Sequence, residues 1–388
     1  MRAQDRRRLR IGLVTHYMPP HHGGIERVAE TLFSGYARAE LDVRWVASRA
    51  PVTEPARQDE RVRVSCCNAL ERILGVPVPL WGWQGWRELS ALAGWADVLH
   101  VHDCLYPGSV FAVMLGRRAR KPVLLSQHVG FVRYRLPLLN WIENAAYSTL
   151  GRTVLRRVSW LVVATPTAAN HVATLLGHTP RHLSTIPNGI DTSQFRPATP
   201  AERRLARQRL GLPPQAPIVL FVGRLVEKKG IRLVAAMSRQ LSSIRFLIVG
   251  DGPLRQVLGE RPDNVTWIPA LSPHRMPDCY FAADCLVLPS HGEGLPLVVQ
   301  EAMACGLPAV ISEDEPFATE LGRVNVCSLA PRTVAGMAAR IQEVLTSSPH
   351  SLRFRARAYA DSQWSAQLMI QRYVALLQQL VRSESGPR

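Results

Sequence analysis

The sequence lacks long apolar runs. Its longest ones, such as 160–164 and 285–288, fall far short of the roughly 18 apolar residues that a membrane-spanning helix needs. The apolar stretch behind the N-terminal arginines ends before Thr15, which is too short for the core of a signal peptide. We therefore expect a cytoplasmic protein.

Paired cysteines and zinc-ligand spacings are also missing. The seven cysteines show no CxxC spacing, and their odd number argues against a disulfide framework. His100 and His102 alternate along an expected strand end, but the twelve histidines lack the spacing of metal ligands, so we expect no metal. The GxG at 250–252 has no third glycine, and no P-loop or GxSxG occurs, which disfavours a dinucleotide cofactor.

Lysine is scarce, although the chain is strongly basic. The 388 residues include 47 basic and 30 acidic side chains, a net charge of +17, and only three of the basic residues are lysine. Residues 1–190 contribute +11 of this charge, with 24 basic and 13 acidic side chains. Such an excess is typical of proteins that bind nucleic acid, an anionic membrane surface or an anionic substrate. The preference for arginine is equally compatible with codon usage.

Short apolar runs alternate with helical periodicity in two successive sets. The first set predicts strands at 9–14, 43–47, 98–101, 123–126 and 161–164. The second set predicts strands at 218–222, 245–249, 265–268, 286–288 and 309–311. Apolar strands that alternate with helices indicate parallel, doubly wound α/β sheets.

A proline-rich segment at 186–217 separates the two sets. We therefore predict two Rossmann-like doubly wound domains that face a cleft lined by the carboxyl ends of their strands. The expected boundaries are 1–190 for the first domain, 191–363 for the second, and 364–388 for a C-terminal helix that packs back on the first.

The strongest motif is HGEGLPLVVQEAMACGLPAV at 291–310. Glu293 and Glu301 lie eight residues apart around the start of an expected helix, and Pro296 suits its first turn. Free backbone amides at a helix N-terminus attract phosphate groups or sugar hydroxyls, and Glu301 has the chemistry to accept hydrogen bonds from a diol. We expect these amides at Gly294, Leu295 and Leu297. The plain alternative is that Glu293 caps the helix and Glu301 is solvated.

This stretch resembles the EX7E signature of the family 4 retaining glycosyltransferases, which have the two-Rossmann GT-B architecture. Other segments resemble features of that family in the same order along the chain. They are PPHHGGIE at 19–26, PNGID at 187–191, GRLVEKKG at 223–230, VGDGP at 249–253 and YFAADCLVLPS at 280–290. The resemblance implies a nucleotide-diphosphate sugar as donor substrate, no cofactor and no catalytic metal.

The resemblance also implies roles for residues in the second half of the chain. Arg224 and Lys229 would hold the donor diphosphate, and Lys228 is the alternative to Lys229. A guanidinium fork and a fixed ammonium suit a leaving group whose negative charge grows as the glycosidic bond breaks. Glu301 would bind the ribose, and Glu293 would lie near the reacting face of the donor sugar, as stabiliser or nucleophile.

Two sites in the first half carry further expectations. Gly23 and Gly24 permit close approach of a phosphate or sugar to a helix N-terminus. His128 follows an expected strand where the family carries an important histidine, so it would bind the donor sugar or handle an acceptor proton. The family's His-Asp pair is absent here, because Val129 follows.

Residues 131–160 mix arginines with apolar side chains and contain one acid, Glu143. The arginines are Arg133, Arg135, Arg152, Arg156 and Arg157, and the apolar residues include Leu138, Trp141, Ile142, Ala145, Leu150 and Leu155. A Pro/Gly-rich loop upstream holds Trp81, Trp83 and Trp86. The mixture suits an anionic membrane surface. Two alternatives stay open: the apolar residues form core beneath a solvated arginine face, or Trp81 and Trp83 stack on acceptor sugars.

We therefore predict a retaining, metal-independent glycosyltransferase for cell-envelope glycan synthesis, located at the inner face of the cell membrane. It would move a sugar from a nucleotide-diphosphate sugar to a hydroxyl of a lipid-linked or polysaccharide acceptor. The alternatives on the same architecture are a sugar phosphorylase and a nucleotide-sugar epimerase. The alternative of another class is a basic nucleic-acid-binding protein, but the chain shows no recognition module, so we expect no nucleic-acid partner.

Overall fold

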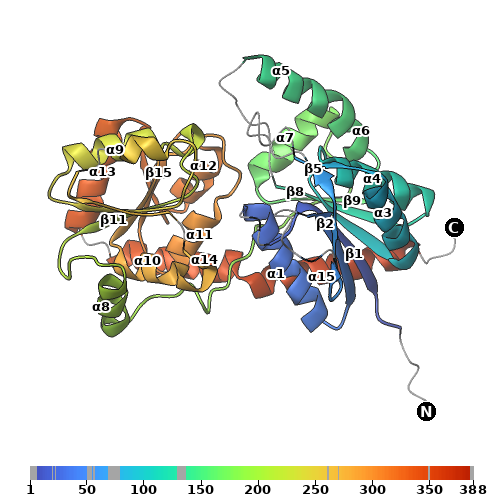
Figure 1. The fold of residues 1–388 in the computed structure, drawn as a ribbon, viewed down its shortest axis with the longest axis horizontal. Coiled ribbons are helices and arrows are strands. Elements are labelled where there is room, and N and C mark those ends of the chain that lie inside the picture. The colour runs from blue at the N-terminus through green and yellow to red at the C-terminus, as the bar shows by residue number, and fades with distance from the viewer. Residues whose placement is uncertain are drawn as a thin grey trace, which may run out of the picture. The chain divides into compact units, whose positions relative to one another are not determined.

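The computed structural model describes residues 7–19, 21, 23–49, 55, 57–68, 79–128, 137–259, 262–269, 271–347 and 350–384. The chain divides into two compact units (Figure 1). Unit 1 comprises Met1–Gly189 and Ala366–Arg388, and unit 2 comprises Ile190–Ser365. Among the residues of the motifs and of the basic stretch, Pro20, His22, Val129, Arg133 and Arg135 lie outside the described residues.

Unit 1 is built on an eight-stranded sheet in the order β10-β9-β8-β7-β1-β2-β4-β3. All neighbouring strands are parallel except β3 and β4. The strands are β1 (Arg10–Tyr17), β2 (Asp42–Ser48), β3 (Arg57–Gln58), β4 (Arg61–Val64), β7 (Val98–His102), β8 (Val123–Gln127), β9 (Trp160–Val163) and β10 (Leu183–Thr185). A separate antiparallel pair joins β5 (Cys66–Cys67) to β6 (Leu80–Trp81).

Helices complete unit 1, and the last of them comes from the end of the chain. Figure 1 shows α15, in red, running beside α1, and α15 contacts both α1 and β7. The helices are α1 (Gly24–Arg38), α3 (Trp83–Trp95), α4 (Pro107–Arg118), α5 (Pro137–Ala146), the π-helix η1 (Tyr147–Gly151), α6 (Arg152–Leu155), α7 (Pro166–Leu176) and α15 (Ala366–Glu384).

Unit 2 is built on a six-stranded, fully parallel sheet in the order β13-β12-β11-β14-β15-β16. The strands are β11 (Ile218–Val222), β12 (Arg245–Val249), β13 (Val265–Ile268), β14 (Cys285–Leu288), β15 (Ala309–Ser312) and β16 (Ser328–Ala330). The α-helices are α8 (Pro200–Arg209), α9 (Ile231–Gln240), α10 (Met276–Ala282), α11 (Leu297–Ala304), α12 (Pro316–Arg323), α13 (Val334–Ser347) and α14 (His350–Trp364). Short 3₁₀ turns lie at η2 (Glu227–Lys229), η3 (Arg255–Leu258) and η4 (Pro273–Arg275).

The two sheets share one topology, which confirms the predicted pair of Rossmann-like domains. In each unit the first strand lies in the middle of the sheet, and the chain builds outward on one side before it crosses to the other. The order reverses between β1 and β7 in unit 1, and between β11 and β14 in unit 2. Ligands of open α/β sheets bind beyond the carboxyl ends of the strands at such a switch point. The two switch points are therefore where functional side chains are expected.

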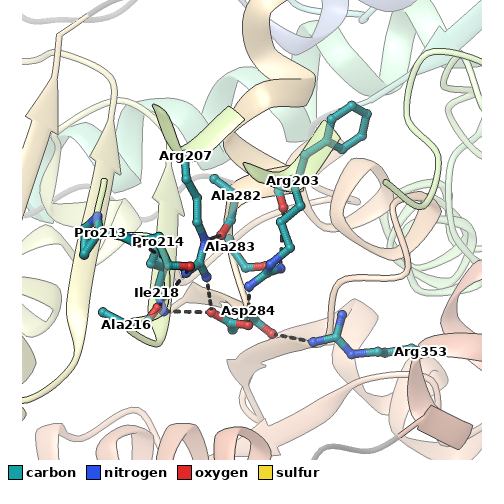
Figure 2. A network of polar contacts seen from close by, with 11 residues as sticks. Arg203, Arg207, Pro213, Pro214, Ala216, Ile218, Ala282, Ala283, Asp284 and Arg353 are labelled. Atoms are coloured by element: carbon teal, nitrogen blue, oxygen red, sulfur yellow. Dashed lines mark hydrogen bonds and ion pairs between the residues drawn. The ribbon is translucent and has the colours of Figure 1, made fainter. Parts of the chain in front are cut away.

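A partly buried carboxylate fixes the first helix of unit 2 to its sheet (Figure 2). Asp284, which precedes β14, binds Arg203 at 2.6 Å, Arg207 at 2.9 Å and the backbone amide of Ile218 at 3.0 Å. Arg353 donates to the carbonyl of Asp284 at 3.4 Å. The Arg207 guanidinium also donates to the carbonyls of Ala282, Pro213, Pro214 and Ala216. Charged residues of α8 therefore form an internal network instead of a solvated face.

Candidate functional site

At the switch point of unit 2, the loop 223–230 leaves β11 and the loop 289–296 leaves β14. The two loops are in direct contact, because the His291 amide donates to the Lys228 carbonyl at 2.9 Å. Gly230 has a φ of 73°, and a Cβ atom there would lie 2.1 Å from the Pro289 carbonyl oxygen. Only glycine fits at this close approach. This steric requirement explains why the expected phosphate-binding segment ends in glycine.

The two loops bring a carboxylate and two lysines together. The Lys229 Nζ lies 3.0 Å from one oxygen of Glu293, and the Lys228 Nζ lies 3.8 Å from the other. The Glu293 side chain is 11% exposed. Burial raises its pKa, but the two lysines lower it by more, so the net pKa lies below its usual value and Glu293 is ionised. The geometry thus joins Glu293 and Lys229 and keeps Lys228 beside them.

Arg224 lies on the same loop with an exposed side chain. Within the described part of the chain, its guanidinium takes part in no ion pair or hydrogen bond, in contrast to the ammonium groups of the two lysines. An exposed guanidinium beside a paired lysine leaves a cationic group available to an incoming anion.

The motif helix begins one residue later than predicted. Pro296 is the N-cap of α11, with extended backbone, and the first helical residue is Leu297. Both plain alternatives are wrong, because Glu293 lies three residues before the cap and Glu301 is fully buried. The Tyr280 hydroxyl donates to the Glu301 carboxylate at 2.5 Å. Leu295 is buried, while Gly294 and Leu297 are half-buried at the start of the helix.

Sequence reasoning missed Glu315, the N-cap residue of α12. Its carboxylate accepts from the Ser290 hydroxyl at 3.0 Å and from the Glu293 amide at 3.1 Å. Burial raises the pKa of Glu315 to about 7. An acid that follows β15 and directly precedes Pro316 is a recognisable helix-start signal, and β15 is the strand next to β14, from which the motif loop leaves.

In unit 1, His128 follows β8 and lies within a hydrogen-bonded group beside the switch point. Its amide donates to Asp103 at 2.9 Å, and its Nδ1 lies 3.1 Å from the Asn188 Oδ1. Its Nε2 lies 2.8 Å from the His102 Nδ1. Because the Asn188 oxygen accepts, His128 carries its proton on Nδ1 and accepts from His102 through Nε2. Both ring nitrogens are therefore engaged, and a sugar hydroxyl would have to replace one of these partners.

The histidines of this group are neutral. Burial lowers the pKa of His128 to about 4 and that of His100 to about 3, and it also holds the pKa of His102 well below its usual value. His100 lies 3.0 Å from the Tyr36 hydroxyl and 2.8 Å from the Ser126 hydroxyl. A neutral imidazole can donate or accept a hydrogen bond, but it supplies no fixed positive charge.

Gly23 is the N-cap of α1, and Gly24 is its first residue. A Cβ atom at Gly23 would lie 2.1 Å from the Glu26 carboxylate, which folds back over this helix end. Glu26 accepts from His21 at 2.7 Å and lies 3.5 Å from His16. Burial raises the pKa of Glu26, but the histidines lower it by more. An ionised carboxylate at this N-terminus favours a hydroxyl over a phosphate there.

The apolar residues of the basic stretch divide between core and surface. Leu155 is buried, but Leu138, Trp141 and Ile142 are 66%, 69% and 47% exposed on α5. Arg156 and Arg157 are exposed on the turn after α6. Arg156 and the half-buried Arg152 both donate to the Leu176 carbonyl at the end of α7, at 3.5 Å and 3.2 Å. The expectation that all the apolar residues form core is therefore wrong for α5.

The tryptophans upstream also differ from one another. Trp81 is 9% exposed and donates its indole N–H to Ser48 at 2.6 Å, so it cannot stack on a sugar. Trp83 is 79% exposed. Trp86 is half-buried against Phe111.

The described helices include none with the length and apolar character needed to cross a bilayer. Within the described residues, no three His, Cys, Asp or Glu side chains form a group that could hold a metal ion. All seven cysteines are free thiols.

Comparison with protein families gives matches in both units. Residues 22–194 match the model described as Glycosyltransferase Family 4, and residues 202–361 match the one described as Glycosyl transferases group 1. The chain belongs to the family 4 glycosyltransferases. The predicted family is thereby confirmed.

Curated members of the family align with part of the chain. The D-inositol 3-phosphate glycosyltransferase of Segniliparus rotundus is 33% identical over 217 residues, which are 51% of this chain and 46% of that protein. The 2-deoxystreptamine glucosyltransferase of Streptomyces kanamyceticus is 27% identical over 289 residues, which are 70% of this chain and 73% of that protein. The chain spans about half the length of two inositol 3-phosphate enzymes, 46% of the Segniliparus rotundus protein and 52% of the Acidothermus cellulolyticus protein.

Solved structures of this fold cover nearly the whole chain. Sucrose-phosphate synthase from Thermosynechococcus elongatus superposes with a TM-score of 0.81 and 20% identity, over 97% of this chain and 100% of that one. HepE of Anabaena, solved with UDP, superposes with a TM-score of 0.75 and 16% identity, over 96% of this chain and 100% of that one. WaaG, a glycosyltransferase involved in lipopolysaccharide biosynthesis, superposes with a TM-score of 0.68 and 18% identity, over 95% of this chain and 99% of that one. These likenesses establish the GT-B fold.

Proposed function

We propose that the chain is a retaining glycosyltransferase that moves a sugar from a nucleotide-diphosphate sugar to an acceptor hydroxyl. The observation that carries this proposal is the Glu293–Lys229 pair at the switch point of unit 2, with Arg224 exposed on the same loop. A sheet's switch point that presents cations is suited to a nucleoside diphosphate. Family membership supports the same chemistry, and the related fold of HepE binds UDP.

In the proposed reaction, the bond between the anomeric carbon and the diphosphate oxygen breaks, and the electron pair leaves with the nucleotide. Arg224 and Lys229 stabilise the charge that develops on the diphosphate, which is larger in the transition state than in the bound donor. The acceptor hydroxyl attacks from the same face and gives up its proton to an oxygen of the departing diphosphate, so the anomeric configuration is kept. Glu293 is ionised, and it stabilises the positive charge on the sugar ring.

Two further residues keep the roles that the sequence predicts for them. Glu301 would bind the ribose hydroxyls, which requires that it share its carboxylate with Tyr280. His128 would bind a sugar hydroxyl as a neutral hydrogen-bonding group, by exchanging Asn188 or His102 for the substrate.

The acceptor side is proposed to be unit 1, acting on a lipid-linked or polysaccharide acceptor at an anionic membrane. Leu138, Trp141 and Ile142 expose apolar area on α5, and Arg156 and Arg157 are exposed nearby in the chain. Apolar anchors with arginines are suited to the headgroup region of anionic lipids. The free cysteines agree with the reducing cytoplasmic side, where a nucleotide-sugar donor would be met.

The test is a transfer assay with UDP-, GDP- and ADP-sugars and extracted membrane lipid as acceptor, with and without EDTA. We expect one donor class to give a glycolipid whose NMR spectrum shows the donor's anomeric configuration, unaffected by EDTA. An inverted product, or loss of transfer in EDTA, would refute the retaining or the metal-independent part. A requirement for inorganic phosphate would indicate a phosphorylase instead, and conversion of the donor to an epimer without acceptor would indicate an epimerase.

A further inference from the structure

Glu315 is a buried carboxylate behind the loop that carries Glu293, and the proposed reaction does not use it. Its side chain is 1% exposed. One carboxylate oxygen accepts from the Ser290 hydroxyl at 3.0 Å, and the other accepts from the Glu293 backbone amide at 3.1 Å. A single side chain thus holds both ends of the four-residue segment 290–293.

Other contacts restrain the start of this segment. The His291 amide donates to Lys228 at 2.9 Å, and Arg332 binds the Pro289 carbonyl at 3.1 Å and the His291 ring at 3.0 Å. Among the described contacts, the amide of Glu293 itself is bound by Glu315. Loss of Glu315 would therefore release the end of the segment that presents the Glu293 carboxylate, while its start stays restrained.

The charged groups around Glu315 come from every loop packed against it. Lys228 and Lys229 belong to the loop after β11, His291 and Glu293 to the loop after β14, and Arg332 to the turn before α13. Exposed Glu313 and Asp314 precede Glu315 in the chain. Burial raises the pKa of Glu315 to about 7, whereas the lysines hold the pKa of Glu293 below its usual value. Near neutral pH the proton therefore belongs to Glu315 and the negative charge to Glu293.

Both protonation states of Glu315 preserve the segment's hydrogen bonds. The ionised carboxylate accepts from Ser290 and from the Glu293 amide. The neutral acid still accepts from the amide, and its own O–H can donate to the Ser290 oxygen. Titration therefore changes the charge behind the Glu293–Lys229 pair without releasing the segment.

We propose that Glu315 is a positioning residue for Glu293, and that its charge state changes how strongly the Lys229 cluster binds an anionic donor. The first half rests on the geometry of the loop alone. The second half rests on the proposed function, because it needs a diphosphate beside Lys229. When Glu315 is neutral, the cluster carries one negative charge fewer and attracts an anion more strongly.

Hydrogen exchange tests the positioning role without any ligand. We compare wild type, E315A, E315Q and the control E313Q, in which a neighbouring exposed acid is neutralised. Glutamine can accept from the Glu293 amide and donate to Ser290, so E315Q and E313Q should exchange like wild type. In E315A the Glu293 amide should exchange at least about tenfold faster, as expected for loss of a hydrogen bond of about 1.4 kcal/mol. Unchanged exchange in folded E315A would overturn the positioning role.

Should E315A fail to fold, Ser290→Ala releases the other contact, and faster exchange of the 290–293 segment then supports the proposal while unchanged exchange overturns it.

The electrostatic half is tested by titrating UDP, GDP and ADP into the protein between pH 6 and pH 8. For whichever nucleotide binds, wild type should lose about two- to fivefold more affinity over this range than E315Q. Equal pH dependence in the two proteins would overturn that half. If wild type binds none of the nucleotides, the proposed function fails, while the exchange result still decides the positioning role.

Discussion

The switch points of the two units have the same topology but opposite electrostatics. In unit 2 the loops beyond β11 and β14 present charges: an ionised Glu293, two lysines and an exposed Arg224. In unit 1 the corresponding region presents mainly buried, neutral rings, among them His102 and His128, and one ionised carboxylate, Glu26, which is held by His16 and His21. One topology therefore serves two kinds of chemistry, because the side chains at the strand ends decide whether a charged or an uncharged group is bound.

Burial explains this difference. His100 and His102 lie within the sheet of unit 1 and are fully buried, so the charged imidazolium is disfavoured. Glu293 is also largely buried, but two lysines from the neighbouring loop compensate for its desolvation. A buried charge persists at either strand end because polar partners stabilise it: the two lysines for Glu293, and His16 and His21 for Glu26.

The largest effect is expected from the charge network at the base of unit 2. Asp284→Ala leaves the buried Arg207 and the half-buried Arg203 without their carboxylate. We expect a cost of about 3 kcal/mol, at the lower end of the range for a buried pair, because Asp284 is itself 23% exposed. We expect the free energy of unfolding of unit 2 to fall by that amount, which urea denaturation would measure as a lower midpoint concentration. The control is Glu343→Ala, which breaks the exposed pair with Arg340 and should cost less than about 1 kcal/mol. Equal effects of the two variants would show that the network is not structural.

The second-largest effect is expected on the turnover number, from loss of a lysine at the switch point of unit 2. Lys229→Ala should lower kcat by about 10²–10³, since a fixed group that stabilises transition-state charge is lost. Lys228→Ala should have a smaller effect, because its ammonium lies 3.8 Å from Glu293 rather than 3.0 Å. Steady-state transfer rates of both variants check this order. A reversed order would move the diphosphate contact to Lys228.

The two switch points should also respond to pH in opposite directions. The pKa of His128 is lowered to about 4, so its contribution to stability is present above the unfolded value of about 6.5 and is lost as pH falls through 4. The pKa of Glu315 is raised to about 7, so its contribution is complete below 4.5 and is lost as pH rises through 7. Thermal unfolding from pH 4 to pH 8 should show a weaker acid decline for His128→Asn and a weaker neutral decline for Glu315→Gln. If neither variant changes the profile, the assignment of these groups is wrong.

The smallest effect concerns the surface of unit 1. Replacing Arg156 and Arg157 by Gln should weaken binding to anionic vesicles by about 2 kcal/mol at low salt, and Trp141→Ala should weaken it further. Phe354→Ser is the matched control, because Phe354 is an equally exposed aromatic residue, 77% exposed, in unit 2. Vesicle sedimentation at two salt concentrations measures this. Wild type that ignores anionic vesicles at low salt would instead favour a soluble acceptor.

The central strands were predictable because a parallel sheet buries both faces of each strand. The ranges 218–222 and 245–249 agree with the inner strands β11 and β12 residue for residue, and 265–268 agrees with β13 at one edge of the sheet. The short edge strands β3 and β16 have no such apolar run and were missed. Pro296 lay one residue outside the helix, because proline is compatible with both the cap and the first turn.

The candidate site was predictable where the motif is local. Glu293 and Lys229 do come together, since each follows the carboxyl end of one of two adjacent strands. Glu315 and His102 were not recognised as part of the sites, because their partners are distant in sequence and only the folded sheets bring them close. The exposure of the tryptophans could not be predicted from the sequence either. Trp81 is buried and donates to Ser48, while Trp83, two residues later, is exposed.

The most direct measurement is calorimetric titration of UDP, GDP and ADP into wild type, Lys229→Ala and Lys228→Ala. We predict that wild type binds at least one of these diphosphates. Lys229→Ala should bind that nucleotide about tenfold or more weakly, because a charge-assisted contact worth about 1.5–3 kcal/mol is lost, and Lys228→Ala should lose less. Absence of nucleotide binding by folded wild type, or full affinity in Lys229→Ala, would contradict the assignment of unit 2 as the donor-binding domain.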